Sequence, residues 1–586
     1  MLKILKHLGI KEWTLIFVSL LFIVVQVWLD LRLPDYMSEI TLLVQTPGST
    51  MGEIWQAGGY MLLCALGSLV ASVIVGFFAA RVAASFSKKL RALLFDKVES
   101  FSMQEINQFS TASLITRSTN DITQVQMIVA MGLQVIIKAP ILAVWAVVKI
   151  SGKSWQWTAS TAGAVAFLLV LVTVIVLFAL PKFKKVQVLT DNLNKVTREN
   201  LTGLRVVRAY NAEEYEEAKF AKANHELTAT NLFTSRIMAI MQPGMGLIMS
   251  GLNLAVYWIG AYLINAAGIR DKMVLFSDMV VFSAYAMQVV MAFMMLTIIF
   301  ILLPRAAVAA NRINEVLETQ QGIVDGTVSA SSSALKGEIE FRKVSFRYPG
   351  APEYVLKDVS FTARQGETVA FIGSTGSGKS TLINLIPRFY DATEGEVLVD
   401  GVNVKDYQQR VLYNKLGYVP QGAVLFSGSV SSNVAYGDNG QDQATLQDVK
   451  KALEIAQGQE FVEKMDGQYE AAISQGGANI SGGQKQRIAI SRAICRKPEI
   501  YIFDDSFSAL DYKTDRRLRA VLKKETAHIT SLIVAQRVGT IIDADKIIVL
   551  DEGRVVGVGT HQELLKNCAV YQEIAYSQLS EEELAG

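Results

Sequence analysis

Long hydrophobic runs fill the first half of this 586-residue chain, and shorter apolar segments separated by polar ones fill the rest. Six of the runs are long enough to cross a bilayer as helices, namely residues 13–33, 60–84, 128–150, 158–180, 237–266 and 279–303. The second half alternates short apolar strands with amphipathic segments, as soluble α/β domains do. The pattern predicts a polytopic α-helical membrane domain of six transmembrane helices fused to an α/β domain.

Basic side chains between the runs set the predicted orientation. Lys3, Lys6 and Lys11 precede the first run, and the segments between runs two and three and between runs four and five are rich in lysine and arginine. Because positively charged segments stay in the cytoplasm, we expect a multi-pass protein of the cytoplasmic membrane whose N-terminus and α/β domain are cytoplasmic. Residues 87–101 and 191–230 have helical spacing and mixed charge, so spans two to five should continue as long cytoplasmic extensions.

Charge and composition limit the remaining possibilities. The net charge of +2 gives no support for a nucleic-acid partner, and the three cysteines have neither metal-ligand spacing nor a plausible disulfide framework. A Ser- and Ala-rich stretch at residues 328–335 indicates a linker. The predicted domains are therefore 1–315 for the membrane helices and their two intracellular loops, 316–335 for the linker, and 336–586 for the α/β domain.

A glycine-rich loop in the second half predicts a nucleotide site. Residues 373–380 fit the pattern G-x-x-x-x-G-K-[ST] after an apolar run, so backbone N–H groups can cradle phosphates at a helix N-terminus. Lys379 would place a positive charge on the β- and γ-phosphates, and Ser380 would offer a hydroxyl to Mg²⁺. Asp504, which follows another apolar run, would hold the ion through its water shell. We therefore expect this chain to bind ATP with Mg²⁺.

A second block identifies the kind of ATP site. The sequence Ser-Gly-Gly-Gln at 481–484 is followed by Lys-Gln-Arg and lies just upstream of the acidic pair at 504 and 505. This block resembles the signature of ATP-binding cassette (ABC) proteins, and the resemblance extends over residues 336–575. It implies a P-loop ABC ATPase domain in which ATP is bound by Tyr348, Gly373, Ser374, Thr375, Gly376, Ser377, Gly378, Lys379, Ser380, Thr381 and Gln421. It also implies Mg²⁺ contacts from Ser380, Gln421 and Asp504, and a D-loop that contains Ser508 and Asp511.

Two positions depart from the family pattern inside the catalytic pocket. Asp505 stands where the family has the glutamate that polarises the attacking water, so its carboxylate is one methylene short. General-base catalysis depends on hydrogen-bond reach before it depends on pKa. Gln536 takes the place of the switch histidine, and its amide can donate a hydrogen bond but lacks an imidazole. We predict that this chain's own site hydrolyses ATP poorly.

The departures predict the partner. In the family, each ATP is sandwiched between the phosphate loop of one domain and the signature of the other, so a homodimer of this chain would carry two impaired sites. We expect a heterodimer with a second ABC half-transporter that retains the glutamate and the histidine. The intact signature of this chain, Ser481, Gly482, Gly483 and Gln484, would complete that partner's site. A slow homodimer, in which Asp505 serves as a weak base, is the alternative.

The membrane half supports a transporter of the exporter class. Residues 111–121 and 199–213 resemble the two intracellular loops of type I (type IV in newer schemes) ABC exporters, whose short coupling helices dock on the ATPase domains. The resemblance implies ATP-driven export of hydrophobic or amphipathic compounds, such as drugs, by alternating access. The alternatives are a lipid or peptide exporter of the same architecture, or a nucleotide-gated regulatory or channel subunit.

Methionines recur at helical spacing in runs five and six. Their flexible side chains suit pockets for varied apolar ligands, although helix packing explains the same spacing equally well. Gln288 is costly against lipid and more natural in a cavity, whereas Lys138 is expected to extend to the cytoplasmic interface, with a role in the cavity as the alternative. The candidate cavity residues are Met241, Met245, Gln288, Met291 and Met295.

Overall fold

The computed structural model describes residues 2–46, 48–329 and 335–579, which form two compact units. The helical unit comprises Met1–Glu99 and Thr111–Thr319, and the sheet unit comprises Ser100–Ser110 and Gln320–Gly586. Of the predicted linker, 316–335, residues 330–334 lie outside the described residues, and residues 316–318 belong to the end of helix α12 (Ile269–Glu318). Val328, at its start, forms a parallel bridge with Tyr407 of the sheet unit.

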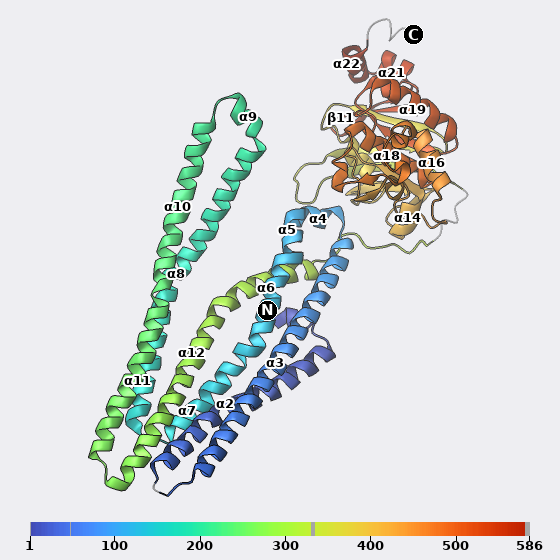
Figure 1. The fold of residues 1–586 in the computed structure, drawn as a ribbon. Coiled ribbons are helices and arrows are strands. Elements are labelled where there is room, and N and C mark those ends of the chain that lie inside the picture. The colour runs from blue at the N-terminus through green and yellow to red at the C-terminus, as the bar shows by residue number, and fades with distance from the viewer. Residues whose placement is uncertain (1, 47, 330–334, 580–586) are drawn as a thin grey trace. The chain divides into compact units, whose positions relative to one another are not determined.

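The helical unit consists of long helices joined by short turns (Figure 1). Its elements are α1 (Leu2–Leu5), α2 (Ile10–Gln45), α3 (Met51–Glu99), α5 (Thr111–Thr116), the π-helix η1 (Arg117–Asp121), α6 (Ile122–Met131), the π-helix η2 (Gly132–Ile136), α7 (Lys138–Ser151), α8 (Trp155–Thr202), α9 (Leu204–Ala209), α10 (Glu213–Ala239), α11 (Met241–Ala266) and α12 (Ile269–Glu318).

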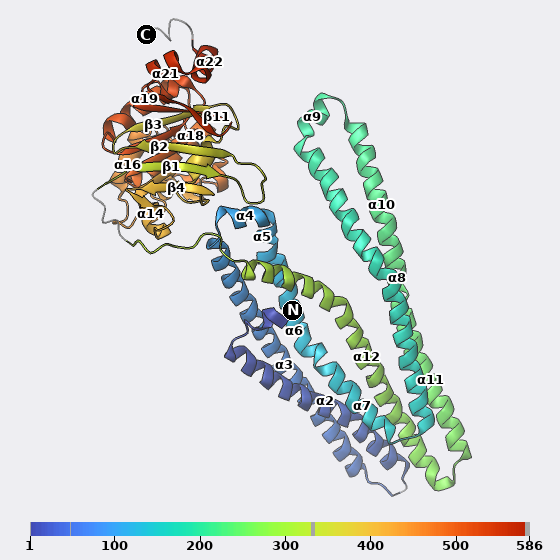
Figure 2. The ribbon, with the colours of Figure 1, turned by 180° about the vertical axis from the view of Figure 1, so that it is seen from behind.

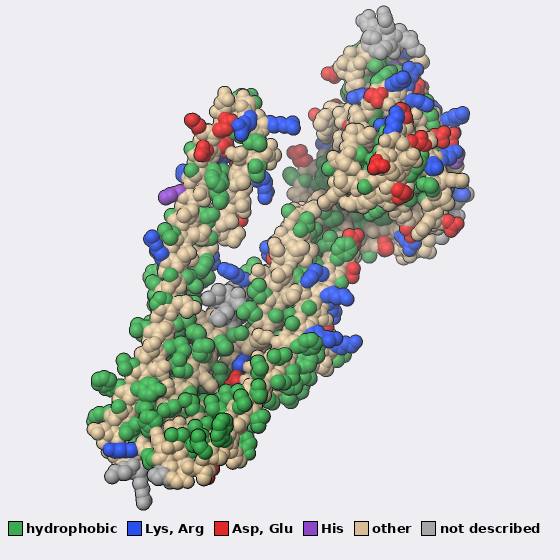
Figure 3. All heavy atoms as spheres, in the orientation of Figure 1, with side chains coloured by type: hydrophobic (Ala, Val, Ile, Leu, Met, Phe, Trp, Pro, Cys, Tyr) green, Lys and Arg blue, Asp and Glu red, His purple; other side chains and the backbone are tan. Residues whose placement is uncertain are grey.

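Six helical segments among the described residues are long and apolar enough to span a membrane, which confirms the six predicted spans. Several continue beyond the predicted ends, because α3 and α8 run through residues 87–99 and 191–202 without a break. The first span is also longer than predicted, since α2 passes through Pro34 and reaches Gln45. Figure 3 shows hydrophobic side chains gathered over the part of the unit that holds α2, α7 and α11.

Helices α8, α9 and α10 form a hairpin that we call the arm, Trp155–Ala239. Figures 1 and 2 both show its α9 end diverging from α2, α3 and α12. Near the other end of the arm, Trp157 donates its indole N–H to the Val256 carbonyl oxygen at 3.0 Å, and its ring centroid lies 5.5 Å from that of Phe282. The arm is therefore anchored at its membrane end and extends freely at its α9 end.

The sheet unit contains a six-stranded sheet in the order β12-β11-β3-β10-β9-β6, a four-stranded antiparallel sheet in the order β2-β1-β4-β5, and the pair β7-β8. In the larger sheet all neighbours are parallel except β12, which pairs with β11 in the antiparallel sense. The carboxyl ends of five strands therefore meet at one edge, where α/β folds bind ligands.

The strands of this unit are β1 (Ile339–Phe346), β2 (Leu356–Ala363), β3 (Thr368–Gly373), β4 (Glu394–Val399), β5 (Val402–Asn403), β6 (Leu416–Val419), β7 (Gly428–Ser429), β8 (Ala472–Ile473), β9 (Ile500–Asp504), β10 (Thr530–Val534), β11 (Lys546–Asp551) and β12 (Arg554–Gly559). Its helices are α4 (Met103–Phe109), α13 (Lys379–Asn384), α14 (Gln409–Lys415), α15 (Val430–Val434), α16 (Leu446–Ile455), α17 (Gln459–Glu463), η3 (Gln468–Glu470), η4 (Gln475–Gly477), α18 (Gly482–Cys495), α19 (Tyr512–Glu525), α20 (Val538–Ile541), α21 (His561–Asn567) and α22 (Ala569–Gln578).

Helix α4 precedes residues 111–121, the segment that the sequence singled out as a coupling loop, and it belongs to the sheet unit. Ser102 caps its N-terminus in a capping box with Glu105. The Glu105 carboxylate accepts a hydrogen bond from the Gly322 backbone N–H at 3.1 Å, and the Asn107 amide donates to the Tyr390 hydroxyl at 3.0 Å. Polar contacts thus hold this short helix on the rest of the unit.

Candidate nucleotide site

The predicted ATP-binding residues converge at the carboxyl edge of the larger sheet. Strand β10 lies between β3 and β9, so Val534 is the neighbour of both Phe371 and Asp504. The phosphate loop follows β3, Asp504 ends β9, and Gln536 follows β10. Residues that are far apart in the sequence are thereby brought to one place by strand order alone.

Glycine is required in the phosphate loop at Gly378. Its φ is +97°, and a Cβ there would lie 2.8 Å from a methyl carbon of Leu356 and 3.1 Å from the Val355 carbonyl oxygen. The left-handed backbone and the close neighbours both exclude a side chain. Helix α13 begins immediately afterwards at Lys379, so its N-terminal N–H groups face the loop.

The Lys379 ammonium is held by neutral oxygens. It donates to the carbonyl oxygens of Gly373 at 2.9 Å and Ser374 at 2.7 Å, and to the Ser377 hydroxyl at 3.2 Å. Burial lowers the pKa of Lys379, and the nearby carboxylates of Asp505 and Asp504 oppose this effect. The ammonium is thus positioned over the loop where a phosphate chain would lie.

Ser380 and Asp504 form the predicted magnesium corner. The Ser380 hydroxyl donates to Asp504 Oδ1 at 2.8 Å. Burial raises the pKa of Asp504, and the hydrogen bond from Ser380 opposes the rise. Within the described part of the chain, no group of three or more His, Cys, Asp or Glu side chains could hold a metal ion. A hydroxyl and one carboxylate nevertheless fit Mg²⁺, which takes few protein ligands and completes its shell with phosphate oxygens and water.

Asp505 is held by two glutamines. Its Oδ2 accepts hydrogen bonds from the Gln536 amide at 2.8 Å and the Gln421 amide at 3.3 Å. Its backbone N–H donates to the Val534 carbonyl oxygen at 3.0 Å, and its φ is +46°. Burial raises the pKa of Asp505, while the hydrogen bond from Gln421 acts in the opposite direction. The two positions that depart from the family pattern are thus in direct contact.

Tyr348 lies beside the phosphate-loop helix. Its hydroxyl is 2.9 Å from the Thr381 hydroxyl of α13. Its ring meets the Tyr390 ring edge-on, with centroids 5.2 Å apart and an interplanar angle of 89°. Tyr390 is also the residue that accepts the hydrogen bond from Asn107 of α4. Tyr348, the side chain expected to contact adenine, therefore contacts both helix α13 and Tyr390, the residue that binds Asn107 of α4.

The signature residues present an exposed helix N-terminus. Ser481 caps α18, because its backbone N–H donates to the Gln484 side-chain oxygen at 2.9 Å and its hydroxyl accepts from the Gln484 N–H at 3.4 Å. Ser481 and Gly482 are exposed. A Cβ on Gly483 would lie 3.2 Å from the Ala509 carbonyl oxygen, so the signature packs against the D-loop.

The D-loop connects the signature to the acidic pair. Its Ser508 hydroxyl donates to the Asp505 carbonyl oxygen at 2.9 Å. Asp511 caps α19 by accepting from the Thr514 backbone N–H at 2.9 Å. A shift of this loop would therefore move both Asp505 and the signature residues, because the loop contacts both.

The candidate cavity residues lie in the helical unit. Met245 is buried in its core, while Met241 and Gln288 are partly buried. Met291 and Met295 are also partly buried on α12. The expectation that Lys138 extends to the cytoplasmic interface was wrong, because its ammonium pairs with Asp30 of α2 at 3.2 Å. In a low-dielectric medium, a nearby carboxylate stabilises the charge without any need to reach water.

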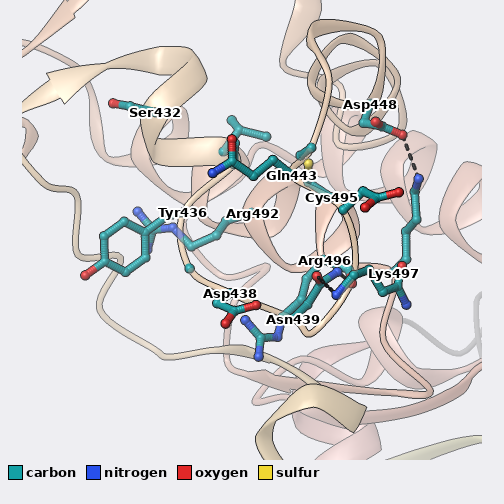
Figure 4. A pocket seen from close by; sticks show the side chains of 16 residues that line it. Ser432, Tyr436, Asp438, Asn439, Gln443, Asp448, Arg492, Cys495, Arg496 and Lys497 are labelled. Carbon is teal, nitrogen blue, oxygen red and sulfur yellow. Dashed lines mark hydrogen bonds and ion pairs between the residues drawn. The ribbon is translucent and has the colours of Figure 1, made fainter. Parts of the chain in front are cut away.

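A separate cavity of about 650 Å³ lies where α15, the loop before α16 and the end of α18 meet (Figure 4). Its cationic groups are already engaged. Lys497 pairs with Asp448 at 2.6 Å, and Arg496 donates to the Tyr413 carbonyl oxygen at 3.1 Å. The Arg492 guanidinium lies over the Tyr436 ring, 5.4 Å from its centroid. The cavity is distinct from the phosphate loop, and these contacts are structural.

Comparisons with known proteins agree with this geometry. Residues 15–318 match the family model described as the ABC transporter transmembrane region, and residues 356–508 match the model described as ABC transporter. An uncharacterized ABC transporter ATP-binding protein of Mycobacterium tuberculosis is 39% identical over 521 residues, which cover 89% of this chain and 87% of that protein. An uncharacterized ABC transporter ATP-binding protein of Bacillus subtilis is 36% identical over 538 residues, 90% of each chain.

Two further similarities extend this picture. The ATP-dependent lipid A-core flippase of Pseudomonas aeruginosa is 31% identical over 526 residues, 89% of this chain and 85% of the flippase. A solved structure of a bacterial Atm1-family ABC exporter with ATP bound superposes with a TM-score of 0.79 at 23% identity, and the match covers 97% of this chain and 98% of that one. At that identity the second match concerns the fold alone.

Proposed function

Since this chain belongs to the ABC transporter family and has the fold of an exporter half-transporter, we propose that it exports hydrophobic or amphipathic compounds as the degenerate-site subunit of a heterodimer. One observation carries the proposal. The carboxylate at the water-activating position is an aspartate, Asp505, and the side chain that fixes it is Gln536 where the family has histidine.

The proposed impairment lies in reach and orientation. A glutamate would extend the carboxylate by one methylene, about 1.5 Å. Proton affinity is not the limiting property, because burial raises the pKa of Asp505 and so favours a base. The Gln536 amide holds the carboxylate but cannot accept or release a proton in place of an imidazole. A site built this way positions water poorly while its other parts remain complete.

The nucleotide-gripping side chains support retention of ATP at this site. Lys379, the N-terminus of α13 and Tyr348 would bind the triphosphate and the base, and Ser380 with Asp504 would hold Mg²⁺. When bound, Mg²⁺ neutralises phosphate charge. Gln421 would complete the metal contacts once its amide turns from Asp505. We infer that the site keeps ATP across several turnovers.

Two exposed surfaces support a partner chain. The signature Ser481–Gln484 caps a helix whose N-terminus faces solvent, as a surface that completes another chain's site would. The tip of the arm carries Leu204, Val206 and Tyr210, which are 45%, 60% and 79% exposed. Exposed apolar side chains at the end of a long cytoplasmic hairpin are costly unless another surface covers them.

The first experiment compares ATP hydrolysis by the purified chain alone with hydrolysis by the chain co-expressed with a second half-transporter of its own genome that retains the glutamate and the histidine. We expect the chain alone to bind Mg-ATP and hydrolyse it at least tenfold more slowly. The double substitution Asp505→Glu with Gln536→His should then raise hydrolysis by the chain alone. Asp505→Asn with Gln536→His is the matched control. Robust turnover by a verified wild-type homodimer would disprove the degenerate-site role.

Lipid export is the second candidate, and the similarity to lipid A-core flippases favours it. The two candidates share the architecture, so only transport can separate them. Proteoliposomes that contain the co-expressed complex should be assayed in parallel with a cationic dye, a fluorescent lipid and a labelled peptide. ATP-dependent accumulation of the dye supports drug export, and lipid movement alone would transfer the assignment to lipids. Ion conductance without uphill transport would instead indicate a channel subunit.

A further inference from the structure

Helix α2 has a gap in its backbone hydrogen bonding inside the membrane region. Pro34 has no N–H, so the carbonyl oxygen of Asp30 loses its helical donor. The Gln288 amide of α12 donates to that oxygen at 3.2 Å. The Tyr285 hydroxyl lies 3.0 Å from the next carbonyl oxygen, that of Leu31, and shares its single proton between this oxygen and the Asp35 carboxylate. Because Tyr285 and Gln288 are three residues apart, they share one face of α12, and that face supplies the donor that the Asp30 carbonyl lacks.

Ion pairs flank this gap on both sides. Asp30 pairs with Lys138 of α7 at 3.2 Å and also accepts a hydrogen bond from Ser68 of α3. Asp35 pairs with Lys149 of α7 at 2.7 Å and also accepts from Tyr285. One helix is thus tied to three others by side chains on both sides of its proline.

These contacts lie in the outer half of the membrane. Helix α2 starts on the cytoplasmic side at Ile10, and Asp30 is about 30 Å further along at 1.5 Å per residue. That length matches the hydrocarbon core of a bilayer. Lys149 lies near the outer end of α7, and Tyr285 lies about 24 Å from the outer end of α12, whose chain direction is opposite to that of α7.

The contacts are largely shielded from solvent. Tyr285 is 1% exposed, and the Lys138 and Asp30 side chains are 19% and 24% exposed. Gln288 Oε1 is buried without a hydrogen-bond partner among the described residues, so the bond from the Gln288 Nε2 to the Asp30 carbonyl is the one hydrogen bond that this amide makes there. In such surroundings every polar group needs a partner, and each broken contact requires a replacement.

We propose that Tyr285, Gln288, Lys138 and Lys149 form a polar latch that holds α2 against α7 and α12 and that opens when the transport pathway opens to the outside. The proposal rests on the alternating-access part of the proposed function. The arm diverges on the cytoplasmic side, whereas the outer ends stay joined, for example by the hydroxyls of Ser38 and Ser277 at 2.8 Å. On this proposal, the outward path opens between helices that the latch joins.

The proline gives the latch two stable settings. With the outer end closed, the Gln288 amide satisfies the freed carbonyl of Asp30. With the outer end open, water that enters the path can satisfy the same carbonyl. In an unbroken helix this carbonyl would need no outside donor in either setting, so Gln288 would have no open carbonyl of α2 to bind. Pro34 thus makes the contact between α2 and α12 responsive to hydration.

The test measures access from outside to a cysteine at position 277, which is 1% exposed in the closed arrangement. The full-length chain would be expressed in its native cells, where any partner is present, with Ser277→Cys as reporter and Cys64→Ser as background. A membrane-impermeant maleimide would be added to intact cells. Cys495 and Cys568 lie in the cytoplasmic domain and stay unlabelled.

Breaking the latch should speed labelling. We expect Asp35→Asn, and separately the pair Tyr285→Phe with Gln288→Leu, to raise the labelling rate roughly three- to tenfold. The exchange Asp35→Lys with Lys149→Glu should return the rate to near the reference. Glu39→Gln removes the same charge from an exposed position of α2 and should have no effect. Rates equal to those of this control in both latch variants, at equal surface amounts, would overturn the proposal.

A second measurement addresses variants that fold poorly. Pro34→Ala restores an N–H for the Asp30 carbonyl, so Gln288→Leu should change the labelling rate less in the Pro34→Ala background than in the wild-type background. An equal effect in both backgrounds would show that Gln288 does not act through the proline gap and would overturn the proposal. Neither assay needs a substrate or a measured ATPase rate. A failure of the drug-export or heterodimer proposal would therefore leave these results interpretable.

Discussion

The nucleotide site and the polar latch both place lysines near aspartates, yet they use them in opposite ways. Lys379 donates to carbonyl and hydroxyl oxygens of its own loop, so in the described structure its charge is left for a ligand. Lys138 instead pairs directly with Asp30. At the edge of a sheet near water, a lysine side chain can stay charged without a carboxylate partner until phosphate binds. Inside a membrane, the charge must be paired within the protein. The first arrangement suits binding, and the second suits control of helix positions.

The largest predicted effect is on ATP hydrolysis, and it comes from a substitution in the signature. In the co-expressed complex, Ser481→Arg should reduce ATP hydrolysis by about 100-fold or more, because the side chain would place bulk and charge in the partner's competent site. Asp505→Asn should reduce hydrolysis far less, since it alters a site that is already impaired. Steady-state ATPase assays of both variants decide the matter. Equal losses would contradict the division of labour between the two sites.

The next effect concerns nucleotide affinity. Lys379→Ala removes a charge-assisted contact worth about 1.5–3 kcal/mol, so ATP affinity at this site should fall roughly 10- to 150-fold. Nucleotide photolabelling of the full-length chain at varied ATP concentrations measures this affinity. Lys513→Ala, at an exposed position of α19, is the control. Unchanged affinity would mean that Lys379 only stabilises the loop through its bonds to the carbonyl oxygens.

A smaller effect is expected in the helical unit, and it should concern stability. Lys138→Met leaves the Asp30 carboxylate without its cation and should cost about 0.6–2 kcal/mol. The double substitution Asp30→Asn with Lys138→Met should cost less, because no unpaired charge remains. Thermal unfolding of the full-length chain in detergent would compare them with Lys185→Met, an exposed lysine of α8. A double variant as unstable as Lys138→Met would argue against the ion pair.

The smallest effect should come from the tyrosine expected to contact adenine. Tyr348→Phe removes the hydroxyl that lies 2.9 Å from Thr381 but keeps the ring, so ATP affinity should fall by no more than about fivefold. Tyr348→Ala also removes the stacking surface and should cost more. The same photolabelling assay separates the two. If both substitutions have the same effect, the hydroxyl rather than the ring carries the contribution of Tyr348.

What the sequence could predict depends on how local each signal is. The strand, loop and helix around Lys379 and the six membrane spans are encoded by contiguous residues, and the structure contains them. The contact between Gln536 and Asp505 required the order of β9 and β10, which contiguous patterns do not specify. That the two departures from the family pattern touch each other is visible only in three dimensions.

The sequence does not predict the latch, because the residues that form it are distant in the chain. Polarity alone predicts that Gln288 lines a cavity and that Lys138 extends to the cytoplasmic interface. Neither interpretation included Asp30, which contacts both. One available signal was Pro34 in an apolar run with an acidic residue four positions earlier, since the freed carbonyl and the carboxylate both require partners.

The placement of the charges on α2 has a consequence for how the chain is made. Asp30 and Asp35 leave the ribosome before α7, which carries the lysines that pair with them, and before α12, whose Tyr285 donates a hydrogen bond to Asp35. Translocon insertion of such a charge costs about 2.5–3.5 kcal/mol at the centre of a helix and less toward the membrane surface, where Asp30 and Asp35 lie. The first span of this protein therefore enters the bilayer before the cations that pair with Asp30 and Asp35 are made, because Lys138 and Lys149 arrive with the third span. A nascent chain arrested before α7 should insert its first helix less completely than the finished protein does.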